Sequence, residues 1–324
     1  MNLAFLSFFN GLSFRGAETF THELASRLSQ KMQVIVYQNG KPDPKNSYQT
    51  KYLPSLYLMP DFDPLPDIII PLNGRIQAVQ TKLWSVRHNT KIIISGQSGI
   101  GFDDRLNLYT FPKAFVSQTD FQLQWAKKIN PFVKHFKIPN GVDVHKFNPG
   151  IKPLDFGLPK PVVVCTAAFE TIKRHTLLIE AISRTKASLL LIGTGSLETQ
   201  IAGLAEQKLG SKRFKIQSLP YFRMPQVYTG CDLFVYPVAP WESFGISILE
   251  AMASGLPVVA TDDPIRREIV GNAGKFADPV QIDQFAKTID QALNSEWKDL
   301  PQIQADKFSW DGIANLYLNL CNSL

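Results

Sequence analysis

The segment 232–261 restricts the fold more than any other part of the chain. It predicts an apolar strand around Phe234, a loop, a helix that opens near Gly245 and ends at Gly255, and a second apolar strand directly afterwards. A helix that connects two apolar strands is the repeating unit of a parallel sheet. The segment therefore predicts an α/β fold.

The same rhythm recurs in both halves of the chain. Apolar strands are predicted at residues 2–9, 33–37, 67–71, 91–95, 114–117, 161–166, 188–192, 232–236 and 256–261, with amphipathic helices at 18–30, 175–184 and 197–209. Between the halves, residues 148–160 contain three prolines and two glycines, a composition that suits a linker. We therefore expect two Rossmann-like domains, 1–150 and 151–310, with a substrate cleft between them at the carboxyl ends of their strands.

Size and cysteine content limit the class of protein. The chain has 324 residues, 44% of them hydrophobic, which is enough for two cores. It contains no apolar stretch of the roughly 20 residues that span a bilayer, and its first residues lack a basic leader. The three cysteines are widely spaced in apolar sequence, which predicts buried thiols in a reducing compartment. A cytoplasmic protein is expected.

Positive charge is concentrated in the first half. Residues 1–150 hold 17 lysines and arginines against ten acidic residues, whereas residues 151–324 hold 17 against 18. This asymmetry suits an anionic membrane face, a phosphorylated substrate, nucleic acid or merely a solvated basic surface. Charge alone does not distinguish these four possibilities, although nucleic acid is disfavoured because no motif for binding it is present.

A basic and aromatic segment lies within this half. Its lysines and histidine interleave with three aromatic residues, the full set being Trp125, Lys127, Lys128, Phe132, Lys134, His135, Phe136 and Lys137. The pattern fits a lipid-phosphate acceptor or peripheral contact with the inner face of a membrane. A helix with a basic exposed face and an aromatic buried face is the simpler interpretation.

Two glutamates give the segment 232–261 its chemical character. Glu242 stands in the loop and Glu250 on the helix that follows. A carboxylate that accepts two hydroxyl hydrogens fixes a sugar or ribose diol strongly, because charge-assisted hydrogen bonds are roughly twice as strong as neutral ones. The helix N-terminus beside Gly245 presents backbone N–H groups to an anion. Without further context, one helix-terminal and one surface carboxylate explain the pattern equally well.

Residues 240–261 closely resemble the E-x7-E donor site of the retaining GT-B glycosyltransferases, which are also known as glycosyltransferase family 4 or glycosyl transferases group 1. The family pattern of Glu, a small residue, Phe-Gly, a hydrophobic stretch, Glu-Ala-Met-Ala, Gly and Pro-Val-Val-Ala-Thr is almost complete here, with Ser243 where glycine is more usual. The resemblance implies that Glu242 binds donor-sugar hydroxyls and that Glu250 binds the ribose. It also implies donor contacts from Ser243, Phe244, Gly245 and Ile246.

Further matches extend the resemblance along the chain. They are Arg-Gly-Ala-Glu at 15–18, Ile-Pro-Asn-Gly-Val-Asp at 138–143, Leu-Leu-Ile-Gly-Thr-Gly-Ser-Leu-Glu at 190–198 and Phe-Ser-Trp-Asp at 308–311. They imply a GT-B fold with an N-terminal acceptor domain and a C-terminal donor domain. Residues 311–324 would form a terminal helix on the acceptor domain, and Arg15 and Gly16 would lie near the donor diphosphate.

Two positions depart from the family pattern. The family places an Arg five residues before the Lys that binds the diphosphate; Lys173 is present, but Ala168 replaces the Arg, and Arg174 is the available substitute. Many relatives also carry a His after the strand matched by residues 91–95, where this chain continues into Gly-Gln-Ser-Gly. The acceptor or donor contacts expected in this domain are Gln97, Ser98, Asp103 and Asn140. Asp103 and Asp104 fit a solvated loop pair more simply.

Two other signals are discounted. Gly193 and Gly195 follow a strand, but Glu198 replaces the third glycine of a dinucleotide fingerprint. Asp61 and Asp63 form an acidic pair like a Mn²⁺ site, yet they lie among prolines and are better explained as a solvated turn. We expect no catalytic metal and no cofactor.

The expected function is transfer of a sugar from a UDP- or GDP-sugar to an unidentified glycan, lipid-linked or small-molecule acceptor, with retention of configuration implied by the resemblance. Glu242 and Lys173 are the expected catalytic residues. The alternatives are a GT-B epimerase or phosphorylase, or a nucleotide-sugar-binding protein without transferase activity.

Overall fold

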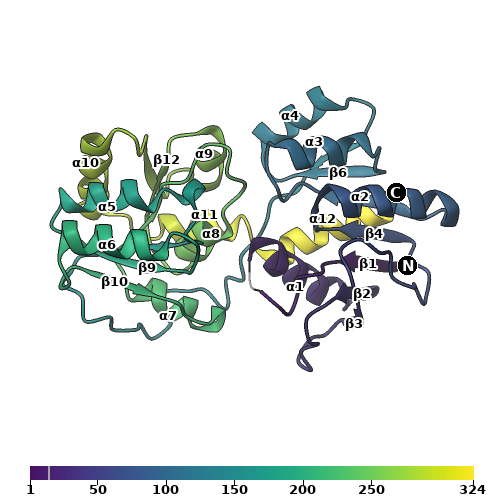
Figure 1. Ribbon diagram of the computed structural model, residues 1–324, viewed down its shortest axis with the longest axis horizontal. Coiled ribbons are helices and arrows are strands. Elements are labelled where there is room, and N and C mark those ends of the chain that lie inside the picture. The colour runs from purple at the N-terminus through teal and green to yellow at the C-terminus, as the bar shows by residue number, and fades with distance from the viewer. Residues whose placement is uncertain (14) are drawn as a thin grey trace. The chain divides into compact units, whose positions relative to one another are not determined.

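The computed structural model describes residues 1–13 and 15–324. The chain divides into two compact units, each an α/β structure built on one parallel sheet (Figure 1). Unit 1 comprises residues 1–141 and 310–324, and unit 2 comprises residues 142–309. The strand pairs of both sheets are parallel, as the sequence predicted.

Unit 1 contains a seven-stranded sheet with the order β3-β2-β1-β4-β5-β6-β7. Its strands are β1 (Asn2–Leu6), β2 (Gln33–Gln38), β3 (Gln49–Tyr52), β4 (Ile68–Pro71), β5 (Lys91–Ser95), β6 (Ala114–Ser117) and β7 (His135–Lys137). Its helices are α1 (Gly16–Leu28), α2 (Gly74–His88), α3 (Phe102–Tyr109), α4 (Asp120–Ile129) and α12 (Trp310–Ser323). Because parallel crossovers are right-handed and the strand order reverses between β1 and β4, α2, α3 and α4 cover one face of the sheet and α1 covers the other.

Unit 2 contains a six-stranded sheet with the order β10-β9-β8-β11-β12-β13. Its strands are β8 (Val162–Thr166), β9 (Ser188–Ile192), β10 (Phe214–Gln217), β11 (Leu233–Tyr236), β12 (Val258–Thr261) and β13 (Gly274–Ala277). Its helices are α5 (His175–Ser183), α6 (Glu198–Leu209), α7 (Met224–Thr229), α8 (Ile246–Ala253), α9 (Pro264–Val270), α10 (Ile282–Leu293) and α11 (Leu300–Asp306). The order reverses between β8 and β11, which is where doubly wound sheets bind their ligands.

Four strands were not predicted from the sequence: β3, β7, β10 and β13, which are the edge strands of the two sheets. Edge strands are partly exposed, so their side chains do not form the continuous apolar run that marks a buried parallel strand. β3 has no buried residue at all, whereas every residue of β9 is buried. The prediction therefore found the cores of both sheets and missed their edges.

The boundary between the units differs from the expected one. The sequence placed it at residue 150, whereas unit 2 begins at Val142. The backbone N–H of Val142 donates to the carbonyl of Phe308, and the buried ring of Phe147 packs on Tyr221 and Tyr228. These contacts attach the proline- and glycine-rich stretch to unit 2.

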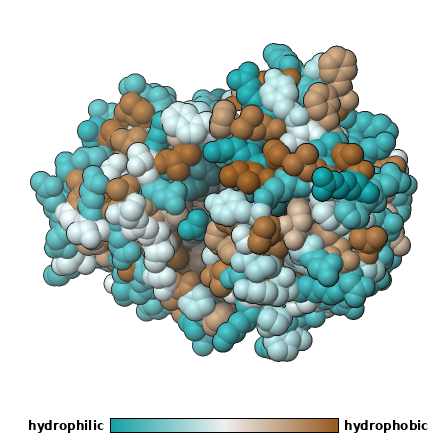
Figure 2. Space-filling model, turned by 45° about the vertical axis from the view of Figure 1, so that its right-hand side comes forward, coloured by the Kyte–Doolittle hydropathy of each residue, from teal (hydrophilic) through white to brown (hydrophobic). Residues whose placement is uncertain are grey.

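Helix α2 reverses the usual amphipathic pattern. Its inward side chains include Gln77, Thr81 and Ser85, which are buried and bonded to backbone groups. Its exposed side chains include Ile76, Val79, Leu83 and Val86. Brown, hydrophobic side chains are visible on the surface of unit 1 in Figure 2. The helix satisfies its polar groups inside the unit and leaves an apolar stripe outside.

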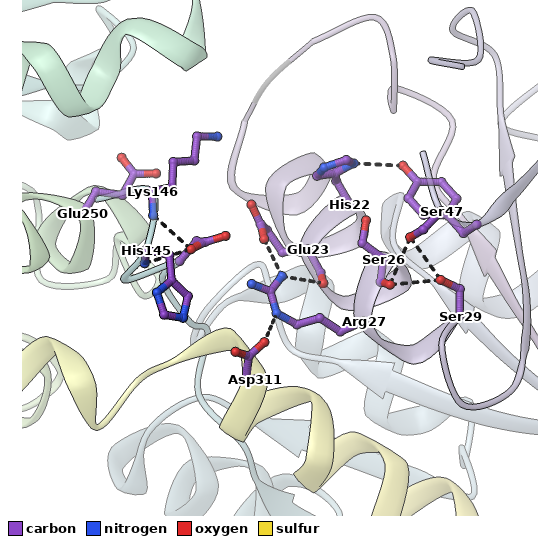
Figure 3. Close-up of polar contacts among 12 residues, drawn as sticks. His22, Glu23, Ser26, Arg27, Ser29, Ser47, His145, Lys146, Glu250 and Asp311 are labelled. Atoms are coloured by element: carbon purple, nitrogen blue, oxygen red, sulfur yellow. Dashed lines mark hydrogen bonds and ion pairs between the residues drawn. The ribbon is translucent and has the colours of Figure 1, made fainter. Parts of the chain in front are cut away.

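Helix α12 packs against α1. The Trp310 and Tyr317 rings contact Phe20 at centroid distances of 6.1 and 5.7 Å. Arg27 of α1 donates to Asp311 at 2.5 Å and to the carboxylate of Glu23 at 2.6 Å (Figure 3). Burial lowers the pKa of Arg27, but its bonds to Asp311 and Glu23 outweigh this effect and leave the pKa raised. The last residues of the chain thus complete the core of unit 1.

Replacing Trp310 by alanine tests this contribution. The side chain is 1% exposed, and large-to-small changes of a buried aromatic residue cost about 3–5 kcal/mol. The free energy of unfolding of unit 1, measured with denaturant, should fall by this amount. Leu316→Ala on the exposed side of the same helix is the control and should cause a much smaller loss. Similar losses in both variants would contradict the packing described here.

Candidate functional site

The carboxyl ends of β8 and β11 bring together two of the predicted residues. Lys173 ends a short turn (Thr171–Lys173) after β8, and Glu242 lies in the loop after β11. The Lys173 Nζ lies 2.8 Å from Glu242 Oε2, and the two side chains are only 15% and 14% exposed. The two residues expected to hold opposite ends of a donor therefore form a largely buried ion pair.

The surroundings keep Lys173 charged. Burial lowers the pKa of Lys173, but Tyr236 and Glu242 raise it, and the net direction is upward. The Lys173 Nζ also lies 5.8 Å from the centre of the Tyr236 ring. His175, at the start of α5, is buried against Phe169, and burial together with the Lys173 charge lowers its pKa to about 4. The cation of this cluster is thus Lys173, and the imidazole is neutral at pH 7.

The loop that carries Glu242 is held by Arg266, a residue that the sequence analysis did not identify. The guanidinium is fully buried and donates to the backbone carbonyls of Pro240, Glu242 and Ser243 at 3.1, 2.9 and 2.6 Å. Its Nε donates to Asp263 at 2.8 Å. The Arg266 guanidinium therefore holds three backbone carbonyls of the loop in place.

The position of Arg266 follows from how α9 begins. Asp263 caps the helix by accepting from the backbone N–H groups of Ile265 and Arg266, and Pro264 occupies the first turn, where a missing N–H costs nothing. The cap places the Arg266 side chain over the same carboxylate. An Asp-Pro helix start is readable from sequence, but the burial of an Arg three positions later is not.

Gly245 has a structural reason of its own. It precedes α8 with a φ of +83°, a left-handed conformation that favours glycine. A Cβ at this position would lie 2.9 Å from the Tyr236 ring. The group that lies closest to this glycine, and that a side chain here would meet, is therefore the Tyr236 ring. Phe244 beside it is buried on Phe308, and Ile246 is also buried.

Glu250 lies inside unit 2. One carboxylate oxygen accepts from Tyr221 at 2.7 Å and the other from Tyr228 at 2.9 Å. Burial and the neighbouring Glu250 raise the pKa of Tyr228 well above its ordinary value, so this tyrosine remains a hydrogen-bond donor. The Lys146 Nζ lies 4.1 Å from the centre of the Tyr221 ring, and Figure 3 shows Lys146 and Glu250 in one view. The Glu250 carboxylate is therefore a hydrogen-bond acceptor that two tyrosines hold in place.

The turn containing Gly193 and Gly195 supports the loop after β8. Cβ atoms at these positions would lie 2.1 Å from the Ala167 carbonyl oxygen and 2.5 Å from that of Phe169. The glycines thus serve close backbone packing rather than a dinucleotide. Ala168 occupies the same loop. Arg174 adopts a left-handed conformation after Lys173 and lies 5.9 Å from the Trp241 ring centre.

In unit 1, the structure joins two of the expected contact residues. Gln97 and Asn140 exchange two amide hydrogen bonds of 3.1 and 3.0 Å, and Gln97 also donates to Ser95 at 2.9 Å. Arg15 and Gly16 mark the start of α1, where the Arg15 N–H donates to Glu18 at 3.2 Å. Arg15 and Gly16 follow β1, Gln97 follows β5 and Asn140 follows β7, so all of them come after the carboxyl ends of strands of this sheet.

The other expected contacts of unit 1 are separated. Ser98 is exposed, and Asp103 forms an exposed ion pair with Arg75. Asp104 is not part of a solvated loop pair, because it is buried and accepts from Asn107 at 3.1 Å and Gln122 at 3.4 Å. Burial raises the pKa of Asp104 to about 7. The interpretation of this acidic pair as solvated is therefore wrong for Asp104.

In the part of the chain that the structure describes, no group of three or more His, Cys, Asp or Glu side chains is placed to hold a metal ion. Asp61 and Asp63 are both exposed, as the solvated-turn interpretation predicted. The three cysteines are free and buried, also as predicted. Within residues 1–13 and 15–324, none of the helices combines the length and apolar composition of a bilayer span.

Comparison with solved structures defines the fold class. HepE from Anabaena, crystallised with UDP and glucose, superposes with a TM-score of 0.81 over 100% of both chains at 17% sequence identity. Sucrose-phosphate synthase from Thermosynechococcus elongatus gives 0.80 over 100% of both chains, also at 17% identity. The chain has the GT-B fold that the sequence predicted.

Sequence comparison identifies a related family. Residues 151–307 match the model for glycosyl transferases group 1, the family that residues 240–261 resemble. O-antigen chain mannosyltransferase B of Escherichia coli is 37% identical over 101 residues, 30% of this chain and 26% of that protein. A GDP-mannose-dependent monoacylated alpha-(1-6)-phosphatidylinositol monomannoside mannosyltransferase of Corynebacterium glutamicum is 28% identical over 51% of this chain and 48% of that protein. These matches span about half or less of the relatives' length.

Arg266→Ala tests the support of the loop. The change removes the guanidinium donor from Asp263 Oδ2 and from three carbonyls, and breaking a buried ion pair costs about 3–5 kcal/mol. The free energy of unfolding of unit 2 should fall by this amount. Arg267, which pairs with Asp262 on the surface, is the matched control. Arg267→Ala should leave the free energy of unfolding close to that of the parent protein. An equal loss of stability in both variants would contradict the proposed support of the loop by Arg266.

Proposed function

We propose that this chain is a retaining glycosyltransferase that moves a sugar from a UDP- or GDP-sugar to an acceptor. The observation that supports it best is the buried ion pair between Lys173 and Glu242 at the ends of the two strands where the sheet order reverses. A cation and a carboxylate at this place match the two ends of a donor, with Lys173 toward the diphosphate and Glu242 toward the sugar hydroxyls.

Donor binding replaces one ion pair by two separate interactions. The Lys173 ammonium exchanges its partner Glu242 for the diphosphate. Glu242 then accepts hydrogen bonds from sugar hydroxyls instead of from the ammonium. Arg174, the loop at Arg15 and Gly16, and the backbone of residues 243–246 are proposed to add further contacts. The rate enhancement then comes from positioning and from stabilising negative charge on the departing diphosphate.

Glu250 is proposed to hold the ribose. Each carboxylate oxygen has more than one lone pair, so Glu250 can accept a ribose hydroxyl while it keeps its bonds from Tyr221 and Tyr228. Gln97 and Asn140 are the proposed polar contacts on the acceptor side, joined by Ser98 and Asp103 at the surface. Their amide pair provides donors and acceptors but no acid or base at neutral pH.

The acceptor class is a glycan, a lipid-linked sugar or a small molecule. Relatives are named for phosphatidylinositol mannosides and for O-antigen chains, which supports a cell-envelope acceptor. Peripheral association with the inner face of a membrane belongs to the same proposal. Release of UDP or GDP that depends on an added acceptor distinguishes transfer from donor binding alone, and product analysis distinguishes it from epimerisation or phosphorolysis.

Glu242→Gln and Lys173→Met should fail differently. Glu242→Gln releases Lys173 from its partner, so the affinity for free UDP or GDP should stay the same or rise while transfer falls by about 10²-fold or more. Lys173→Met removes the charge that faces the diphosphate, so affinity should fall about tenfold to a hundredfold together with transfer. Calorimetry with the nucleotide and steady-state kinetics measure the two effects.

A second Lys–Glu pair provides the control. Lys208 and Glu180 of unit 2 lie 3.0 Å apart but at the surface, so Lys208→Met and Glu180→Gln remove the same charges without touching the site. Both should bind nucleotide and transfer sugar normally. Loss of nucleotide binding in Glu242→Gln, or its retention in Lys173→Met, would overturn the proposed donor orientation.

Transfer is proposed to need no divalent metal, because Lys173, Arg174 and helix N-termini face the diphosphate. Full activity should therefore survive an excess of EDTA. Activity that disappears with EDTA and returns with Mn²⁺ would contradict this prediction and direct attention to Asp61 and Asp63.

A further inference from the structure

The outer surface of unit 1 combines net charge with exposed apolar side chains. Unit 1 holds 16 lysines and arginines against ten acidic residues, whereas unit 2 holds 18 of each. Residues 74–137, which form the layer of α2, α3 and α4 with the intervening strands, contain ten of the basic residues and three of the acidic ones. The excess positive charge of the whole chain therefore resides in unit 1, and residues 74–137 alone carry a net charge of +7.

Helix α2 supplies the apolar part of this surface. Ile76, Val79, Leu83 and Val86 follow one another at helical spacing, and Leu83 and Val86 are 66% and 71% exposed. The stripe is about 15 Å long at 1.5 Å per residue. Three of its four buried side chains, Gln77, Thr81 and Ser85, are polar, so the helix turns most of its apolar side chains outward. An apolar stripe that stays in contact with water adds no stability to the fold. Its presence indicates that another phase or molecule covers it.

Neighbouring elements extend the same combination. Phe102 and Phe111 are 65% and 52% exposed, and α3 packs beside α2. Phe132 is 86% exposed, so the interpretation of the basic and aromatic segment as a helix with a buried aromatic face is wrong for this residue. The exposed cations of the layer are Arg75, Arg87, Lys91, Arg105, Lys113, Lys127, Lys128, Lys134 and Lys137. Two of them form ion pairs, Arg75 with Asp103 and Lys137 with Asp120.

We propose that the outward face of α2, together with the adjoining α3 and α4 surface, docks on an anionic lipid bilayer. The apolar stripe enters the headgroup boundary, and the surrounding cations meet lipid phosphates. A soluble polyanion would match the charge but leave Leu83 and Val86 uncovered. A second copy of the chain would bring two faces of the same positive sign together. This inference extends the proposed membrane association and assigns it to residues outside the donor site.

Vesicle binding of the full chain tests the proposal without donor or acceptor. The chain should sediment with phosphatidylcholine vesicles that contain about 30% phosphatidylglycerol, bind pure phosphatidylcholine far less, and dissociate partly at about 0.5 M salt. Arg87→Gln should weaken binding about fivefold, the equivalent of about 1 kcal/mol. Leu83→Glu should weaken it more strongly, because it places a like charge in the stripe.

Matched variants on unit 2 are the controls. Val280→Glu and Lys212→Gln change residues that are also exposed, and both should bind vesicles like the parent chain. Equal binding by Leu83→Glu and the parent, or no binding to anionic vesicles, would overturn the proposal. So would a dimer in sedimentation velocity that Leu83→Glu abolishes while vesicles stay unbound. Nucleotide affinity is measured without vesicles, so failure of vesicle binding is distinguishable from failure of the proposed donor site.

Discussion

The ion pair between Lys173 and Glu242 ties together the two loops that leave the sheet of unit 2 at its point of reversal. Removing two charges from water is costly, and the cost is met only when the geometry is close and each charge has further partners. The Lys173 ammonium lies near the Tyr236 ring, and Arg266 donates hydrogen bonds to carbonyls of the loop that carries Glu242. Gly245 then lets the chain turn into α8 past the Tyr236 ring. The buried polar groups of the site thus depend on one another.

Much of this arrangement could be predicted because it depends on residues that are close together in the sequence. The central strands are continuous apolar runs, and the segment from Glu242 to Gly255 encodes a loop, a helix and its end. The edge strands were missed because half-exposed residues carry no such run. Arg266 was missed for a different reason, since burial of a charged residue depends on three carbonyls that are distant in sequence.

Two other features of unit 1 were not predicted, for the same reason. Asp104 looked like a surface residue because acidic pairs usually are, yet Gln122 and Asn107 bury it. α2 is amphipathic in reverse, and its sequence does not reveal which side faces the sheet. In each case the deciding partner lies on another element, so local patterns predicted the residue but not its environment.

The position of α12 bears on how the chain folds during synthesis. Unit 2 is one continuous stretch, whereas unit 1 needs Trp310 and Tyr317 to cover Phe20. The usual order, in which the N-terminal domain folds first on the ribosome, is therefore reversed for completion of the core. The sheet of unit 1 can form early, but part of its apolar surface stays open until all of unit 2 has been made. For that interval the nascent chain carries an incomplete core that a chaperone would recognise.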